Sequence, residues 1–465
     1  MSDTGGSRRI TRSAPLARAL PMTPRVSRPD KGPLLPPQPA PGKTMQGDVF
    51  DFQMMYHAGE ANPYGFGYVL YHVPSAGAAP RLVKSNQLGH YKPSSTHAYS
   101  VHTVKDTSSV SKSISGFSMM KLISLVPDVS QAHHTMVTTG SAAATTAWRA
   151  LVDHYYNLPI TALLPSPPSG GTDWENIRSS AADGHHHPAA NIRISDLLGH
   201  RSGLAFKSNG KPILDSHGNG IDGDDYSSIE RCLNDWTKAT YEEAQTTTAL
   251  QYANANFAMM RYVIAAFYAR HVHSPASTAT HIGNNATLSA SYVSLTQQHL
   301  FPSSVLSSTP DCSPWGSERS WFASIGPNRT FVDWMNTQSS WPIVSGAQGW
   351  KMSVHQLGYF MASITSGRIF PIEYWQYLLD QIATLPAGYT AGMGVSNGFY
   401  TGIPLYGHNG GDGDGHAESS TWWLAFDDYV LAMMCNSDVA SFFTNGDFVW
   451  EWFFIADLSL FTSYG

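Results

Sequence analysis

Apolar residues are grouped at both ends of the chain into short runs typical of strands. Tyr64–His72 is an almost continuous apolar and aromatic run, and Arg81–Lys84 follows it after a turn. Near the other end, Ser420–Phe426 and Tyr429–Cys435 are separated only by the turn residues Asp427-Asp428. Short apolar runs bounded by turn residues predict strands. We therefore expect a sheet whose strands come from both ends of the chain.

The middle of the chain has helical spacing instead. After Ser109-Val-Ser-Lys112, apolar residues recur at intervals that predict a helix with one buried face; they are Ile114, Phe117, Met120, Leu122 and Leu125. Gln251–Ala266 and Ser353–Ser366 also have a helical pattern. Strands, then helices, then strands predict an α+β fold.

Residues 1–45 differ from the rest in composition. They hold eight Lys and Arg against two Asp, together with nine Pro, and few large apolar residues after Leu20. Such a segment cannot bury enough apolar surface to fold, so we expect a disordered Pro/Arg-rich leader. Residues 46–465 are expected to form a single domain, with a helical part at roughly residues 120–345.

Composition excludes some classes of protein. The chain has 465 residues and a formal net charge of −6, so it can bury a large core and gives no reason to expect a nucleic-acid partner. No segment approaches the roughly 20 apolar residues that cross a bilayer. Trp450–Phe461 is too short and carries two acidic residues, so we interpret it as a packed C-terminal helix, with a membrane-surface role as the alternative. The first residues lack the apolar core of a secretory signal, and a cytoplasmic location is expected.

The cysteines and histidines indicate neither a disulfide framework nor a metal site. Cys232, Cys312 and Cys435 are sparse and odd in number, and Cys435 lies in an apolar run that predicts a small core residue. His185–His187 has no further ligand at metal spacing and is interpreted as a solvated loop. We expect no metal ion and no cofactor.

An acidic segment, Asp215–Asp225, partly matches a calcium-binding loop. His217 and Tyr226 occupy positions three and twelve, where a calcium loop has oxygen ligands. The segment is therefore interpreted as an acidic turn.

The chemistry begins with Ser109-Val-Ser-Lys112. A serine hydroxyl is a poor nucleophile until a base removes its proton, and a lysine whose pKa is lowered by burial can do this. Residues three apart lie on the same face of a helix. A second match, Ser118-Met-Met-Lys121, falls inside the helix, where its serine is enclosed by neighbouring turns. Ser109 opens the helix, where free N–H groups favour an oxyanion, so Ser109 and Lys112 are the candidates.

Three further segments add chemistry. Gln251-Tyr-Ala-Asn254 supplies a hydroxyl at Tyr252 that can relay protons and an amide at Asn254 that can hold a substrate carbonyl. Gly407-His-Asn-Gly-Gly411 precedes a strand-like run, so His408 can point at the site while backbone N–H groups line an edge. Ile194–Leu204 contains a leucine-rich string that ends in a turn, with His200 bracing it.

In this order the segments resemble the serine β-lactamase and penicillin-binding-protein superfamily, nearest its class C, esterase and D-aminopeptidase branch. Members carry S-x-x-K, a leucine–leucine–x–histidine–x–serine–glycine–leucine string, Y-x-N, and K-T-G or H-x-G. The matching segments here are Ser109–Lys112, Leu197–Leu204, Tyr252–Asn254 and His408–Gly410. The resemblance covers roughly residues 60–440, and weaker similarities lie at 159–165, 346–353 and 435–438.

The resemblance implies a fold and roles for residues. The fold is a β-lactamase/transpeptidase-like antiparallel sheet flanked by helices, plus a helical lobe, with the site in the cleft between them. Ser109 is acylated, Lys112 and Tyr252 shuttle its proton, and Asn254 positions the substrate. The backbone N–H groups of Ser109 and Gly411 form the oxyanion hole, beside His408 and Gly410.

Departures from the family pattern affect the expected substrate. His408 stands where β-lactamases and transpeptidases have a lysine, and a mostly neutral imidazole binds a carboxylate less well than an ammonium. This favours esters and amides without that carboxylate. Residues 126–148 and 166–190 look like insertions that reshape the pocket, and Gly415–Glu418, Trp422 and Trp423 are expected to line the acyl site.

The leading hypothesis is a serine hydrolase that acts on a small-molecule ester or amide through a Ser109 acyl-enzyme. An acyltransferase that passes the acyl group to an amine or alcohol is the first alternative. A β-lactamase or D-amino-acid peptidase comes next, followed by a non-catalytic binding module on the same fold. The acyl group, the acceptor and the oligomeric state are left open by the sequence.

Overall fold

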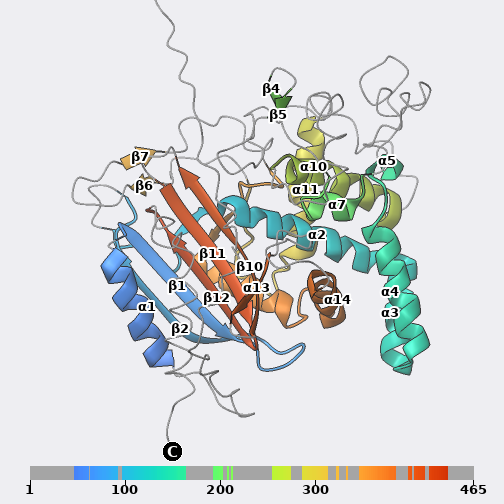
Figure 1. Cartoon of the computed structure of the whole chain (residues 1–465), viewed down its shortest axis with the longest axis horizontal. Coiled ribbons are helices and arrows are strands. Elements are labelled where there is room, and N and C mark those ends of the chain that lie inside the picture. The colour runs from blue at the N-terminus through green and yellow to red at the C-terminus, as the bar shows by residue number, and fades with distance from the viewer. Residues whose placement is uncertain are drawn as a thin grey trace, which may run out of the picture.

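A central antiparallel sheet, built from both ends of the chain, organises the structure (Figure 1). The computed structural model describes residues 47–61, 63–92, 97–163, 192–202, 207–208, 211–212, 254–273, 285–312, 321–323, 331–333, 345–383, 396–400, 403–413 and 418–437. The main strand order is β2-β1-β12-β11-β10-β9, and β6 also pairs with β11 and with β7. The strands are β1 Gly65–His72, β2 Arg81–Gly89, β6 Trp321–Ala323, β7 Phe331–Asp333, β9 Ser396–Tyr400, β10 Ile403–Gly413, β11 Glu418–Phe426 and β12 Tyr429–Cys435. This confirms the expected α+β class and antiparallel sheet.

Strand alternation divides the sheet between two cores. On the outer face, Phe66 and Leu70 of β1 and Leu431 of β12 pack with Phe50 and Met54 of α1, which spans Gly47–Ala61. On the inner face, the alternate residues of β1, β11 and β12 pack under the large helical core. Figure 1 shows α1 along one face of the sheet and the other helices on the far side and at one end.

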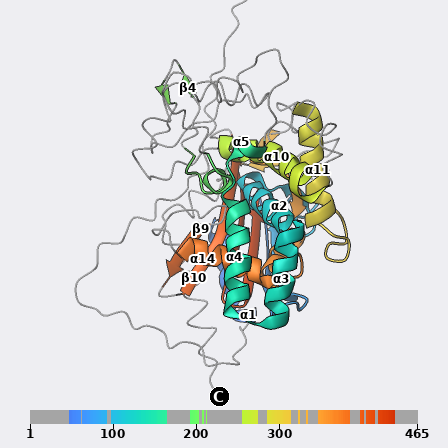
Figure 2. The same ribbon diagram turned by 90° about the vertical axis from the view of Figure 1, so that its right-hand side faces the viewer.

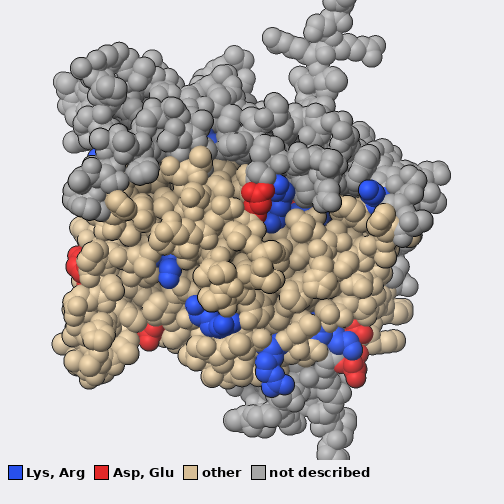
Figure 3. Space-filling model, turned by 180° about the vertical axis from the view of Figure 1, so that it is seen from behind, with Lys and Arg blue, Asp and Glu red and all other residues tan. Residues whose placement is uncertain are grey.

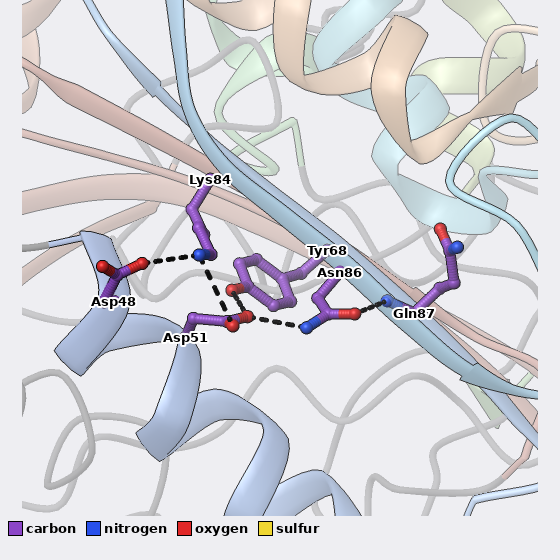
Figure 4. Close-up of polar contacts among 6 residues, drawn as sticks. All are labelled: Asp48, Asp51, Tyr68, Lys84, Asn86 and Gln87. Atoms are coloured by element: carbon purple, nitrogen blue, oxygen red, sulfur yellow. Dashed lines mark hydrogen bonds and ion pairs between the residues drawn. The ribbon is translucent and has the colours of Figure 1, made fainter.

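Polar contacts fix α1 to the strands it covers (Figure 4). The Tyr68 hydroxyl donates to Asp51 at 2.5 Å, and the Asn86 amide donates to the same carboxylate oxygen at 2.9 Å. Lys84 pairs with the exposed Asp48 at 2.7 Å and lies 3.7 Å from Asp51. Asp51 therefore joins α1 to both β1 and β2.

Helix α2, Ser111–Leu125, is the central helix of the molecule. The sequence pattern predicted one buried face, but every residue from Ser111 to Met120 is buried. Its serines and small residues occupy positions that a solvent-facing pattern would give to polar groups, and they are covered by other parts of the fold instead, as Ser113 is by Trp423 of β11. The predicted apolar face is buried, but burial extends around the helix from Ser111 to Met120, so these turns have no solvent side.

The segment at 126–148 forms most of a helical hairpin. It consists of α3, Pro127–Thr139, and α4, Ala142–Tyr156, which run side by side in Figure 2. The α3 helix starts directly after the C-terminal end of α2, and Trp148 and Val152 of α4 are buried in the main core. At a rise of about 1.5 Å per residue, the length of α2 keeps this hairpin roughly 20 Å from Ser109 along the helix. The hairpin therefore supports the core at the far end of α2, and the expectation that it reshapes the pocket is wrong for this segment.

The remaining helices are α5 Ile160–Leu163, α7 Ile194–Leu198, α10 Asn254–Phe267 with a π-helical extension at Tyr268–Val272, α11 Asn285–Leu300, α13 Val354–Thr365 and α14 Ile372–Ala383. Of these, α10 and α11 pack against α2, α13 and α14 contact Phe117 of α2, and α5 and α7 pack on α10. Ser353 caps α13 by accepting from the backbone N–H of Gln356, which confirms the helix predicted at Ser353–Ser366. Two small pairs complete the strands, β3 Val104–Asp106 with β8 Lys351–Ser353, and β4 Lys207–Ser208 with β5 Lys211–Pro212.

Several predicted features lie outside the described residues: the leader at 1–45, the insertion at 166–190 with His185–His187, the acidic segment at 215–225, and Trp450–Phe461. Among the helices that the structure describes, none has the length and apolarity to cross a membrane. Seen from behind, Lys and Arg lie scattered among uncharged residues over the described part of the surface (Figure 3).

Candidate active site

The candidate nucleophile lies on a tight turn between β3 and α2. Ser109 is the middle residue of a 3₁₀ turn, η1, that spans Ser108–Val110 and runs directly into α2. Ser108 has a φ of 49°, an uncommon conformation for a residue with a side chain. Its backbone N–H donates to Asp106 Oδ1 at 2.7 Å, which holds the turn in place. The sequence-based expectation that Ser109 opens a helix is confirmed, with the first turn being 3₁₀.

Lys112 reaches back to this serine. Its Nζ lies 2.9 Å from Ser109 Oγ and 3.1 Å from the Ala347 carbonyl oxygen. Ser109 is 6% exposed and Lys112 is 0% exposed. The amine is therefore within proton-transfer distance of a hydroxyl that keeps a small accessible surface.

The second S-x-x-K match has a structural role. Ser118 is buried and donates to Thr296 of α11 at 3.1 Å, and Lys121 donates to the Ile369 carbonyl at 2.8 Å. Each side chain bonds a different part of the fold. That this match is a coincidence stays a prediction, and these contacts agree with it.

Strand β10 brings His408 to the nucleophile. The sequence placed Gly407–Gly411 before a strand, but these residues lie inside β10, with His408 opposite Trp423 of β11. Cross-strand partners share a face, and the Trp423 indole donates to Ser113 of α2 at 3.1 Å. The face of β10 that carries His408 is thus turned toward the start of α2, as expected.

The His408 imidazole is neutral. Burial, and secondarily the charge of Lys112, lower the pKa of His408 to about 3. The Asn409 carbonyl lies within hydrogen-bond distance of His408 Nδ1. Because a carbonyl only accepts, Nδ1 carries the proton and Nε2 keeps a lone pair. His408 therefore presents an acceptor where a lysine would present a cation.

Gly410 lies where β10 comes closest to the nucleophile. A Cβ at this position would come 2.7 Å from the Thr107 carbonyl oxygen and 2.8 Å from the Ser109 backbone nitrogen. No side chain fits there without displacing the turn that carries Ser109. Gly411 follows, in register with Ser420 of β11. The two glycines thus let a strand backbone run directly past the serine.

The leucine-rich string contacts the start of α10 through two side chains, His200 and Ser202. His200 has a φ of 53° and is fully buried, and its Nδ1 lies 3.3 Å from the Asn256 amide. The Ser202 hydroxyl donates to the amide oxygen of Asn256. The predicted bracing role of His200 is confirmed, and the sequence analysis missed Asn256, which connects the string to the start of α10. Its signal was a polar residue in an otherwise apolar helix.

The Y-x-N segment is only partly described. Asn254 is the first residue of α10, and its Oδ1 is buried with no hydrogen-bond partner among the described atoms. Tyr252 lies outside the described residues. Buried amide oxygens usually accept a hydrogen bond, so Asn254 Oδ1 is a candidate acceptor for a substrate or for a residue outside the described ranges.

Two residues expected to line the acyl site do not do so. Trp423 is fully buried in the core between the sheet and α2, and Trp422 points to the opposite face, in the cluster under α1. Alternation along β11 sends neighbouring indoles to opposite faces. Glu418 begins β11, and Gly415 to Ala417 lie outside the described residues.

The segment after β12 has a structural role. Cys435 is buried in β12, which confirms the prediction of a small core residue. The next residue, Asn436, donates through its amide to the carbonyls of His90 and Tyr91, both at 3.0 Å. Within the described ranges, no three His, Cys, Asp or Glu side chains are grouped so that they could hold a metal ion.

Comparisons with known proteins agree with this architecture. No family model matches the chain, and the search of curated proteins finds no match. Among solved structures, the D-amino acid amidase from Ochrobactrum anthropi SV3, complexed with L-phenylalanine amide, superposes with a TM-score of 0.54 at 15% identity, covering 88% of this chain and 98% of that one. SurE superposes with a TM-score of 0.53 at 15% identity, covering 90% of this chain and 77% of that one. The chain therefore has the β-lactamase/transpeptidase-like fold that its motifs implied.

Proposed function

We propose that this chain is a serine hydrolase in which Ser109 forms an acyl-enzyme with an ester or amide substrate. The observation that carries the proposal is the contact between Lys112 Nζ and Ser109 Oγ, 2.9 Å apart on a turn that β10 approaches through Gly410. A buried amine beside a hydroxyl at the start of a helix is the arrangement that an activated serine needs.

The reaction follows from that contact. Neutral Lys112 takes the Ser109 proton as Oγ attacks the substrate carbonyl, and the carbonyl oxygen becomes an oxyanion. The backbone N–H groups of Ser109 and Gly411 are our candidates to stabilise it. The ammonium then gives its proton to the departing alcohol or amine, and the acyl group stays on Ser109. Water attacks the ester with Lys112 again as base, which releases the acid and restores the serine.

Two residues keep supporting roles within this proposal. Tyr252 is proposed to pass the proton between Lys112 and the leaving group, and Asn254 Oδ1, which has no partner among the described residues, is proposed to accept from a donor on the substrate or on a catalytic side chain. Both assignments rest on the Y-x-N pattern in the sequence.

His408 supports a choice of substrate. With its pKa lowered to about 3, it is uncharged and offers a lone pair rather than a positive charge. A carboxylate next to the scissile bond would meet an acceptor, which is repulsive. The proposed substrates are therefore esters and amides without that carboxylate. Amino-acid amides belong among them, since the O. anthropi neighbour is an amidase by name.

Intact-mass analysis tests the proposal. The chain is incubated with p-nitrophenyl acetate, phenylalanine amide, benzylpenicillin and a fluorophosphonate, and adducts are mapped by peptide sequencing. We expect the fluorophosphonate on Ser109, no labelling of Ser109→Ala, and normal labelling of Ser118→Ala. An adduct on Ser118, or penicillin hydrolysis with a kcat/KM of about 10⁴ M⁻¹s⁻¹ or more, would contradict the assignment of nucleophile or of substrate class.

A further inference from the structure

Lys112 is held by a backbone carbonyl as well as by its serine. A neutral amine has two N–H donors and one lone pair, and only the lone pair can take the Ser109 proton. The Ala347 carbonyl, 3.1 Å from Nζ, accepts one N–H. The position of this carbonyl therefore helps to orient the lone pair toward Ser109 Oγ.

Ala347 lies in a short irregular segment, so no helix or strand fixes its carbonyl. The segment follows Gly346, which has a φ of 103°. A Cβ at Gly346 would come 2.4 Å from the Phe257 carbonyl of α10. The segment is thus pressed against α10 on one side, and it also contacts α2 and α11.

Those contacts form a directed chain of hydrogen bonds. The Trp350 indole donates to the Tyr292 hydroxyl at 2.9 Å, and Ser115 Oγ donates to the Gly346 carbonyl at 2.7 Å. Tyr292 Oη and Ser115 Oγ are 2.7 Å apart. Because the Ser115 proton is used on Gly346, Tyr292 must donate to Ser115. The order is therefore Trp350 to Tyr292 to Ser115 to the Gly346 carbonyl.

The backbone of Trp350, at the first end of this chain, is bonded to the start of α2 and to the residue before η1. The Trp350 backbone N–H donates to Ser111 Oγ at 3.2 Å, and its carbonyl accepts from the Thr107 backbone at 2.8 Å and from the Thr107 hydroxyl at 2.9 Å. The segment that holds Ala347 is thereby tied at Gly346 to Ser115 of α2, and at Trp350 to Ser111 of α2 and to Thr107, just before the turn that carries Ser109.

We propose that Tyr292 is a positioning residue that acts through Ser115 and the Gly346 peptide to hold the Ala347 carbonyl in place. This carbonyl in turn keeps the Lys112 amine directed at Ser109. This rests on the proposed function. Tyr292 is fully buried, and this chain connects it to the Gly346 carbonyl. Burial raises the pKa of its phenol, so it keeps the proton that it donates to Ser115. Linked hydrogen bonds in a dry interior reinforce one another.

The test compares Tyr292→Phe with Tyr377→Phe, using p-nitrophenyl acetate. Tyr377 is a buried phenol on α14 that donates to Asp153, so Tyr377→Phe removes a phenol hydrogen bond away from Lys112, whereas Tyr292→Phe removes those to Trp350 and Ser115. We expect Tyr292→Phe to lower kcat about tenfold with little change in KM, the usual result of losing geometry in the transition state. A displaced Ala347 carbonyl also stabilises the Lys112 ammonium less, which lowers the pKa of Lys112. The rising limb of the pH profile of kcat should therefore move to lower pH by about half a unit. Tyr377→Phe should change neither.

A double variant separates one chain from two independent defects. Ser115→Ala breaks the same chain one bond later and should resemble Tyr292→Phe. If both act through Gly346, the double variant loses about tenfold in kcat rather than about a hundredfold. Multiplying effects, or a Tyr292→Phe profile that matches Tyr377→Phe, would overturn the proposal.

The outcomes also distinguish this inference from the proposed function. A wild-type chain that takes no fluorophosphonate on Ser109 contradicts both. If the wild-type chain is labelled, but Tyr292→Phe and Ser115→Ala have the wild-type kcat and the wild-type pH profile, only the positioning role is contradicted. If Tyr292→Phe does not fold, Ser115→Ala against Tyr377→Phe makes the same comparison.

Discussion

Two lysines on the same helix differ in what surrounds the amine. Lys112 is fully buried against Ser109 and the Ala347 carbonyl, whereas Lys121 donates to the Ile369 carbonyl away from the site. Burial also lowers the pKa of Lys121. A shifted lysine pKa by itself therefore does not identify a base. Contact with the nucleophile does.

The role of Lys112 as base predicts the effect of its replacement. Lys112→Ala should lower kcat by about 10²–10⁴, the usual contribution of a general base. Lys112→Arg should be equally inactive, because a guanidinium keeps its proton. Lys121→Ala should retain kcat and lose about 1 kcal/mol of unfolding free energy with its hydrogen bond. The readouts are initial rates with p-nitrophenyl acetate and urea unfolding. An active Lys112→Arg, or a folded but inactive Lys121→Ala, would remove Lys112 from the mechanism.

His408 predicts a dependence of stability on pH. Its pKa is about 3 in the folded chain and near 6.5 when unfolded, so the unfolded state binds the proton first as the pH falls. The stabilisation is complete above the unfolded pKa and is lost progressively toward the folded value. At about 1.4 kcal/mol per pH unit, wild type should lose roughly 2–3 kcal/mol more than His408→Gln between pH 6.5 and 4.5. Urea unfolding at both pH values measures this, and equal losses in the two proteins would show that His408 is not buried in its neutral form.

At the scale of elements, α1 is fixed to the sheet by one carboxylate. Asp51 receives the hydroxyl of Tyr68 and the amide of Asn86, on adjacent strands (Figure 4). Tyr68 is fully buried. Its burial, and to a lesser extent its hydrogen bond to Asp51, raise the pKa of its phenol, so the phenol keeps its proton and donates it to Asp51. The contact with exposed Asp48 is of a different kind, since solvent screens it.

Replacement of these residues should separate the two contacts. Tyr68→Phe leaves Asp51 short of a donor and should cost about 1–3 kcal/mol of unfolding free energy. Asp48→Asn, the control on the same helix, should leave stability unchanged. Labelling of Ser109 should be normal in both, because α1 covers the face of the sheet opposite α2. Equal stability of the two variants would mean that Tyr68 does not support α1.

At the scale of the whole molecule, the sheet needs a cover on each face. The inner face is covered by α2 and α13 and the outer face by α1, whose Phe50, Met54 and Ala58 are buried on strands β1, β11 and β12. The helix begins at Gly47, just after the Pro/Arg-rich segment that the sequence predicts to be a leader. The two parts of the N-terminal region should therefore behave differently when removed.

Truncation tests that difference. Deletion of residues 1–45 should leave the melting temperature and Ser109 labelling unchanged. Deletion of residues 1–61 should lower the free energy of unfolding by about 3–6 kcal/mol. This is roughly 1.5–3 kcal/mol for each of the two large apolar side chains, Phe50 and Met54, that the outer core loses. Thermal unfolding by circular dichroism compares the two. Equal stability of both truncated chains would contradict a covering role for α1, and a large loss on removing 1–45 would contradict the leader.

The sequence alone predicted the local structure and the residues of the chemistry proposed for this protein. Apolar runs and turns located β1, β11, β12 and α13, because short-range periodicity follows burial directly. The S-x-x-K spacing selected Ser109 and Lys112, because residues three apart on a first helical turn must meet. The replacement of a lysine by His408 predicted a neutral group at that position, and its low pKa agrees.

Only the tertiary structure decided what surrounds those residues. It placed His408 and Gly410 inside a strand, buried α2 on all faces from Ser111 to Met120, and directed Trp422 and Trp423 to opposite faces of the sheet. It also joined Trp350, Tyr292 and Ser115 into one chain, although they lie on segments far apart in sequence. Such contacts depend on which elements pack together, and packing is a property of the whole chain that the spacing of neighbouring residues does not encode.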